Sequence, residues 1–305
     1  MPILGWKIVK SSSVHDDFSL FKAMLISIDS EQRFVMMKYR LPAVAGSFYP
    51  AQATQLNHDV MLLLSAVKVP ESVGKTLENK IPKALIVPHA GYCYSGAVAA
   101  SAYACLKKSE NAIHKVILLG PSHQVALQGC AIPSHDMFTS PNGEIRIDQQ
   151  ACQQLLDLNL VSVNDQAHVW EHSLEVQLPF LHFCLPSFQL VPIVVGHCPP
   201  EIISNILSVF VHSPDTLVVV SSDMSHYHAY HDAQIIDQKT ITKIEHLAPI
   251  IQVDEACGCE AINGLLYFCH LHHWQVQLIQ QANSGDSSPY GDKNKVVGYA
   301  SFIIH

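Results

Sequence analysis

Three apolar runs in this sequence each end close to a histidine. The runs start near residues 84, 116 and 216, and they lead to His89, His123 and His226. In open α/β sheets the loops at the carboxyl ends of parallel strands meet, and ligands bind there. Imidazole binds metals and carries protons near neutral pH. The three runs therefore predict a histidine-containing site on one edge of a sheet.

The remaining sequence alternates strand-like apolar runs with helix-like segments. This alternation predicts a three-layer α/β/α fold with a central mixed, mainly parallel sheet. The predicted strands cover residues 83–87, 115–119, 130–132, 189–195, 216–221, 275–281 and 296–304. The predicted helices cover residues 52–67, 96–106, 148–159, 171–183, 200–211, 233–247 and 254–271. A turn signal at Asn142 and Gly143 adds a β-hairpin.

The composition is that of a chain with a large buried sheet. Of the 305 residues, 49% are hydrophobic and only 14% are charged, as expected when helices cover both faces of parallel strands. Residues 39–305 are therefore expected to form a single α/β domain. Residues 1–38 show no clear periodicity and are expected to be a weakly ordered N-terminal extension.

Charge and hydropathy exclude several classes of partner. The formal net charge is −8, and no cluster of Lys and Arg offers a phosphate-binding surface, so no nucleic-acid partner is expected. No apolar run approaches the roughly 18 residues that a membrane-spanning helix needs, so no membrane partner is expected. The nine cysteines are scattered and odd in number, which favours free thiols and a cytoplasmic location.

Five short motifs occur in a specific order along the chain. They are P-H-A-G-Y at 88–92, G-P-S-H at 120–123, E-H-S-L-E at 171–175, S-S-D-M-S-H at 221–226 and A-C-G at 256–258. In this order the motifs resemble those of the Memo family, whose members are similar to the class III extradiol ring-cleavage dioxygenases. The resemblance covers residues 40–305 and implies an α/β fold with a deep cleft and a mononuclear metal site.

The resemblance also implies the metal ligands. In the Memo pattern the two histidines correspond to His89 and His123, and a cysteine corresponds to Cys257. By resemblance the expected cofactor is a single Fe(II) ion, while the ligand types also suit Cu(I) and Zn(II). Cys257 lies at the expected start of the helix at 254–271, where the helix dipole would favour the thiolate. The alternative is that the C-G-C sequence is only a tightly packed helix start.

A proton carrier is expected beside the metal. His226 corresponds to the acid/base position of the related dioxygenases, and Asp223 could orient an imidazole or accept a hydrogen bond. The alternative is that Asp223 caps the following segment, and that His226 belongs to a solvated histidine cluster.

Four further residues are candidates for contact with a ligand. His172 could point into the cleft from the predicted helix at 171–183, or it could be satisfied by its own neighbours. Phe48, Tyr92 and Tyr94 could form an aromatic wall for a planar or phenolic ligand, although aromatic residues near loops also serve packing.

Two classes of function follow from the resemblance. The first is a metal-dependent oxidative or redox enzyme, which differs from the extradiol dioxygenases in offering Cys257 where they use a glutamate. The second is a non-catalytic module that recognises a phosphotyrosine peptide or a small anionic or phenolic ligand in the same cleft. Related prokaryotic proteins occur in the AmmeMemoRadiSam system, so an AMMECR-type protein and a radical SAM protein are expected as partners in that context.

Overall fold

The computed structural model describes residues 36–77, 81–107, 112–287 and 291–305. Contacts between Cα atoms divide the chain after Met37, and the unit Lys38–His305 carries the fold described below. The expected N-terminal extension lies almost entirely outside the described residues.

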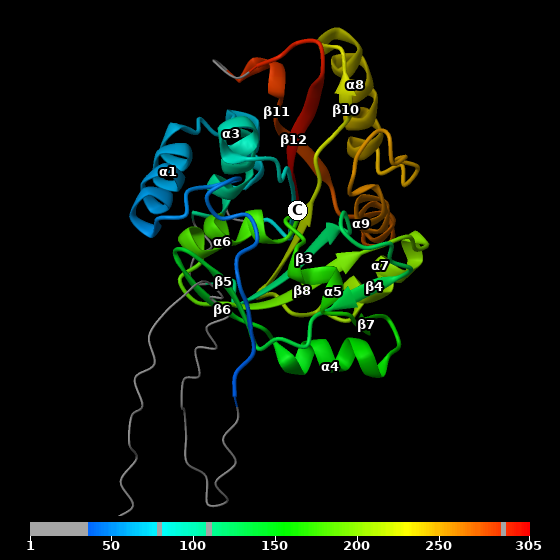
Figure 1. Cartoon of the computed structure of the whole chain (residues 1–305). Coiled ribbons are helices and arrows are strands. Elements are labelled where there is room, and N and C mark those ends of the chain that lie inside the picture. Colours follow the sequence, from blue (N-terminus) through cyan, green and yellow to red (C-terminus); the bar gives the residue numbers. More distant parts are fainter. Residues whose placement is uncertain (1–35, 78–80, 108–111, 288–290) are drawn as a thin grey trace, which may run out of the picture. The chain divides into compact units, whose positions relative to one another are not determined.

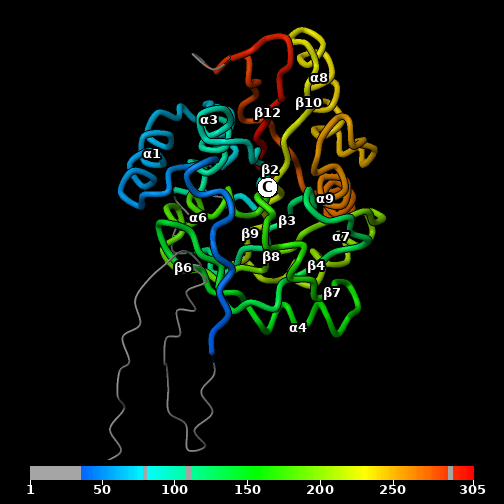
Figure 2. The backbone as a smooth tube through the Cα atoms, in the orientation of Figure 1, coloured from blue at the N-terminus to red at the C-terminus, as the bar shows by residue number. Residues whose placement is uncertain are grey.

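A nine-stranded mixed sheet forms the centre of this unit (Figure 1). Its strand order is β10-β12-β2-β9-β3-β8-β4-β7, and β11 pairs with β12. The strands are β2 (Ala84–Val87), β3 (Lys115–Pro121), β4 (Cys130–Ile132), β7 (Ser162–Val163), β8 (Gln189–Val195), β9 (Thr216–Ser221), β10 (His226–His228), β11 (Val276–Asn283) and β12 (Val296–Ile304). Figure 2 shows the same path as a tube, from β12 towards β7.

The four strands β2, β9, β3 and β8 are parallel to one another, whereas β12 and β4 flank them in antiparallel pairing. The apolar residues of the parallel strands are almost completely buried, because helices cover both faces of the sheet. The sheet is therefore mixed, as predicted, and its parallel part is the group of strands that delivers the candidate site residues.

The helices form one layer on each side of the sheet (Figure 1). One layer contains α1, α3 and α6, and the other contains α7 and α9, which pack against each other. The helices are α1 (Ala53–Ala66), α2 (Glu71–Thr76), α3 (Tyr92–Tyr103), α4 (Gln149–Asp157), α5 (Gln166–Val169), α6 (Leu178–Cys184), α7 (Pro200–Ser208), α8 (Tyr230–Glu245) and α9 (Cys259–His272), with 3₁₀ turns η1 (Ala104–Leu106), η2 (Glu175–Gln177) and η3 (Ser284–Asp286). No described helix is long and apolar enough to cross a membrane.

A second, three-stranded sheet contains the predicted hairpin. It joins β1 (Tyr39–Arg40) to β5 (Met137–Ser140) and β6 (Gly143–Arg146), and the turn between β5 and β6 includes Asn142. After this hairpin Asp148 caps α4, since its carboxylate accepts a hydrogen bond of 2.9 Å from the Ala151 N–H. The predicted hairpin and the predicted helix at 148–159 are both confirmed, because turn and cap signals depend mainly on neighbouring residues.

Two predicted helices begin later than expected. The helix predicted from residue 171 begins as α6 at Leu178, and only the short turn η2 precedes it. The helix predicted from residue 254 begins as α9 at Cys259, with Gly258 as its N-cap. In both cases the apolar spacing also suits a buried loop. These two loops place His172 and Cys257 at the ends of the strands.

Candidate metal centre

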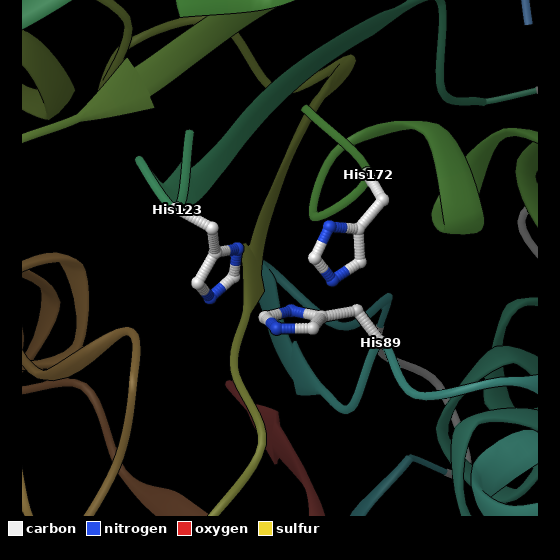
Figure 3. Close-up of side chains that lie close together, drawn as sticks. All are labelled: His89, His123 and His172. Atoms are coloured by element: carbon white, nitrogen blue, oxygen red, sulfur yellow. The ribbon is translucent and has the colours of Figure 1, made fainter. Parts of the chain in front are cut away.

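Three histidine side chains meet at the carboxyl edge of the parallel strands (Figure 3). His89 follows β2, His123 follows β3, and His172 lies in the loop before η2. Their ring centroids are 5.2 Å apart for His89 and His123, 5.4 Å for His89 and His172, and 4.8 Å for His123 and His172. Each ring offers a nitrogen within 4.8 Å of the other two, and this is the group of possible metal donors found among the described residues.

The sheet explains why the first two rings come together. Strand β9 pairs in parallel with both β2 and β3, so the three strands end at the same edge. The loop that carries His172 reaches this edge from the side, because the Ser173 hydroxyl donates a 2.9 Å hydrogen bond to the carbonyl of Pro121, the last residue of β3. Gly120 allows this approach, since a Cβ there would lie 2.7 Å from Ser173 Oγ.

His89 is held by two buried groups. Oδ1 of Asp223 accepts hydrogen bonds from the backbone N–H groups of His89 at 2.7 Å and Ala90 at 3.3 Å. The His89 Nδ1 lies 2.9 Å from Ser221 Oγ. Burial, with smaller contributions from the neighbouring His123 and His172, lowers the pKa of His89 well below its ordinary value. The ring is therefore neutral near pH 7 and can offer a lone pair.

Glu171 holds the other two histidines. Its carboxylate, which is 1% exposed, accepts hydrogen bonds from His123 N at 2.6 Å, His172 N at 2.9 Å and Ser173 N at 2.9 Å. The His123 Nδ1 lies 2.9 Å from the same carboxylate. Burial alone would raise the pKa of Glu171, but the hydrogen bonds from His123 and Ser173 outweigh it and lower this pKa to about 2. The ionised carboxylate only accepts, so His123 donates from Nδ1 and keeps Nε2 for a ligand.

Cys257 lies beside His89 but outside the group of three. Its Sγ is 3.3 Å from His89 Nε2, and its backbone N–H donates to the Asp223 carbonyl at 3.3 Å. Burial, then the nearby Asp223 charge, raises the pKa of the Cys257 thiol. The expectation that a helix start would favour the thiolate is therefore wrong for the metal-free protein, because α9 begins two residues later and the surrounding protein desolvates the partly buried thiol.

The predicted acid/base pair is at the site but is not organised as a pair. His226 is half-buried on β10, close enough for its charge to act on the pKa of His89, and burial lowers its own pKa. The Oδ1 of Asp223 accepts hydrogen bonds from the backbone of the His89 loop, and burial raises the pKa of the Asp223 carboxyl to about 6. Asp223 thus acts on His89 through the main chain.

Of the three residues expected to form an aromatic wall, Phe48 lies beside the three histidines. The ring of Phe48 packs against His172 with centroids 4.7 Å apart. Tyr92 follows the packing alternative, since its hydroxyl donates to the Val176 carbonyl at 2.8 Å and its ring packs on Phe180. Tyr94 lies on the first turn of α3 and is 38% exposed.

Comparison with known proteins places this arrangement in a family. The family model described as Memo-like protein matches residues 40–303. The chain belongs to the Memo family. It is 34% identical over 280 residues to a MEMO1 family protein of Aquifex aeolicus, covering 88% of this chain and 100% of that one. It is 34% identical over 283 residues to one of Sulfolobus acidocaldarius, covering 86% and 98%.

A solved structure supports the fold of this Memo family chain. The uncharacterized protein JW3007 from Escherichia coli K12 superposes with a TM-score of 0.50 at 12% sequence identity, covering 74% of this chain and all of that one. At this identity the likeness concerns the fold alone.

The sequence pattern of this Memo family chain predicted neither His172 as a metal donor nor Glu171 as the residue that holds the two histidines. The acidic residue directly before His172 was the available signal, since ligand histidines commonly pair with a carboxylate. This signal was missed because a continuous helix was expected at 171–183.

Proposed function

We propose that this Memo family chain binds a single metal ion through His89, His123 and His172 and uses it for oxidative or redox chemistry on a small ligand. The observation that supports this most directly is the convergence of three ring nitrogens within 4.8 Å of one another. The Nδ1 atoms of His89 and His123 face away from the group and are hydrogen-bonded to Ser221 and Glu171, respectively. Such partners orient ligand histidines in metal sites.

The donor set fits a borderline transition metal. Three neutral imidazoles suit Fe(II), Zn(II) and copper, and three protein ligands leave positions open for other ligands. We favour Fe(II) because the family is similar to the extradiol dioxygenases. A bound Fe(II) ion would supply open coordination positions and one-electron redox chemistry.

The surrounding side chains would handle the ligand. The Phe48 ring, which packs at a tilt against His172, provides one apolar wall for a planar molecule. His226 is half-buried and its pKa is lowered by burial, so its neutral ring can accept a proton from a phenolic ligand near pH 7. Asp223 keeps the His89 loop in place through the backbone N–H groups of His89 and Ala90.

Metal content tests the proposal directly. Protein purified without a tag would be loaded anaerobically with Fe(II), and separately with Zn(II), and its metal measured by mass spectrometry. His89→Ala and His123→Ala are expected to lose the metal, whereas His58→Ala, on an exposed surface of α1, keeps it. Equal metal content in the wild type and in both site variants would refute a metal centre here.

The third ligand is decided by a second pair of variants. With three histidines as ligands, His172→Ala lowers the affinity strongly, and Cys257→Ala leaves it nearly unchanged. The opposite result would assign the third position to Cys257, which touches Nε2 of His89. Oxygen uptake by the loaded protein with catechols then separates an enzyme from a binding module, because a pure binding site would retain the phenol without consuming oxygen.

A further inference from the structure

The Ser221 hydroxyl lies at the centre of a buried group of polar atoms behind His89. Its Oγ is 2.6 Å from the Ser173 carbonyl oxygen, 2.8 Å from Gln177 Nε2 and 2.9 Å from His89 Nδ1. A hydroxyl has one hydrogen to donate and two lone pairs to accept with. The three contacts therefore use its full hydrogen-bonding capacity, and each contact has a definite direction.

The direction of two contacts follows from their partners. The Ser173 carbonyl can only accept, so the single hydrogen of Ser221 goes to it. The Gln177 amide is oriented by the Pro88 carbonyl, which also can only accept and lies 2.9 Å from Gln177 Nε2. This places the NH₂ group of Gln177 towards both Pro88 and Ser221, while its Oε1 accepts from the Tyr103 hydroxyl at 3.0 Å.

The third contact is then determined. Ser221 has one lone pair left for His89, so His89 Nδ1 must carry a hydrogen and donate it. A neutral imidazole protonated on Nδ1 has its lone pair on Nε2, which is the other nitrogen of the ring. From these contacts we infer that Ser221, oriented by Gln177 and Ser173, is a positioning residue that fixes His89 in the Nδ1–H tautomer and reserves Nε2 for a metal.

Bulk water does not reach this network. Ser173, Gln177 and Ser221 are all 0% exposed, and a buried polar group that loses its partner inside a protein stays unpaired. The network also joins three distant parts of the chain, since Ser221 is 48 residues from Ser173 and 132 residues from His89. The part of the inference that reserves Nε2 for a metal rests on the proposed metal-binding function. The tautomer itself is a property of the metal-free protein.

The test is a ¹⁵N NMR spectrum of metal-free protein labelled on histidine, recorded well above the ordinary imidazole pKa of about 6.5. Protonated and bare ring nitrogens resonate far apart, and the His89 signals are identified by their loss in His89→Gln. We expect a protonated Nδ1 and a bare Nε2 at His89. A dominant Nε2–H form in the wild type would overturn the inference, and this measurement needs no altered network.

Variants then test the cause. Ser221→Ala should mix the two tautomers of His89 and weaken metal affinity by about 10- to 100-fold, the usual effect of losing a partner of a ligand histidine. Ser101→Ala is the matched control, since Ser101 is also buried and hydrogen-bonded to Ser301 far along the chain, and it should leave the tautomer unchanged. A single Nδ1–H tautomer with wild-type affinity in Ser221→Ala would overturn the inference. If the tautomers behave as expected but no metal binds, only the proposed function fails.

Discussion

Gly258 offers a sharp test of how the Cys257 loop is packed against the sheet. A Cβ at this position would lie 2.7 Å from Ser222 Cβ and 2.9 Å from the Ser221 carbonyl oxygen. Its backbone dihedrals, φ −92° and ψ 24°, are accessible to alanine. The cost of Gly258→Ala therefore comes from crowding and not from the backbone conformation.

The magnitude follows from these contacts. Both obstructing atoms belong to the main chain or to a buried Cβ, so the loop must move to make room. Overpacking of this kind costs about 1–3 kcal/mol. The movement also breaks the 2.9 Å hydrogen bond from Gly258 N to Ser222 Oγ, which adds about 0.5–1.5 kcal/mol. We expect Gly258→Ala to lower the free energy of unfolding by about 1.5–4.5 kcal/mol.

Urea unfolding measures this effect, with the midpoint as the readout and the slope as a check on two-state behaviour. Gly74→Ala is the matched control, because Gly74 lies in α2 with nothing within 4 Å of an added Cβ. That change should stabilise the helix by about 0.5–1 kcal/mol. A Gly258→Ala midpoint at or above that of the wild type would refute the close packing described for this loop.

Three other outcomes are expected. Glu171→Gln should weaken metal affinity about 10- to 100-fold in calorimetry, because an amide cannot accept all the hydrogen bonds that the carboxylate accepts. The control Glu144→Gln changes an exposed residue and should leave the affinity unchanged. Equal affinities of the two variants would contradict the role given to Glu171. Burial lowers the pKa of both His89 and His172, so these two rings should stay neutral as pH falls through about 6.5 and take up protons only at lower pH; ¹⁵N spectra of the metal-free protein in which either ring protonates above that value would contradict their burial. Val219→Asp places an unpaired charge at a fully buried position of β9 and should therefore abolish soluble expression. Soluble expression at the wild-type level would contradict the sheet assignment.

The sequence by itself determined seven of the nine strands of the main sheet, all but β7 and β10, and the two histidines that follow β2 and β3. Apolar runs bounded by Pro and Gly are local signals, and β2 and β3 carry them clearly. Parallel strands that share a neighbour end at one edge, so the approach of His89 to His123 followed from the predicted topology. The ordered motifs gave the Memo family, and the family model bears this out.

The tertiary structure alone decided how the site is completed. The position of the His123 ring depends on Glu171, which lies 48 residues away and whose carboxylate contacts both the backbone N–H and the ring of His123. The pKa of Cys257 depends on burial by packed neighbours, which the predicted helix start at residue 254 did not reveal. Ser221 and Gln177 act on His89 only because folding places them in contact behind its ring. Hydrogen-bond direction and desolvation arise between distant segments once water is excluded, whereas the sequence pattern reports mainly the preferences of neighbouring residues.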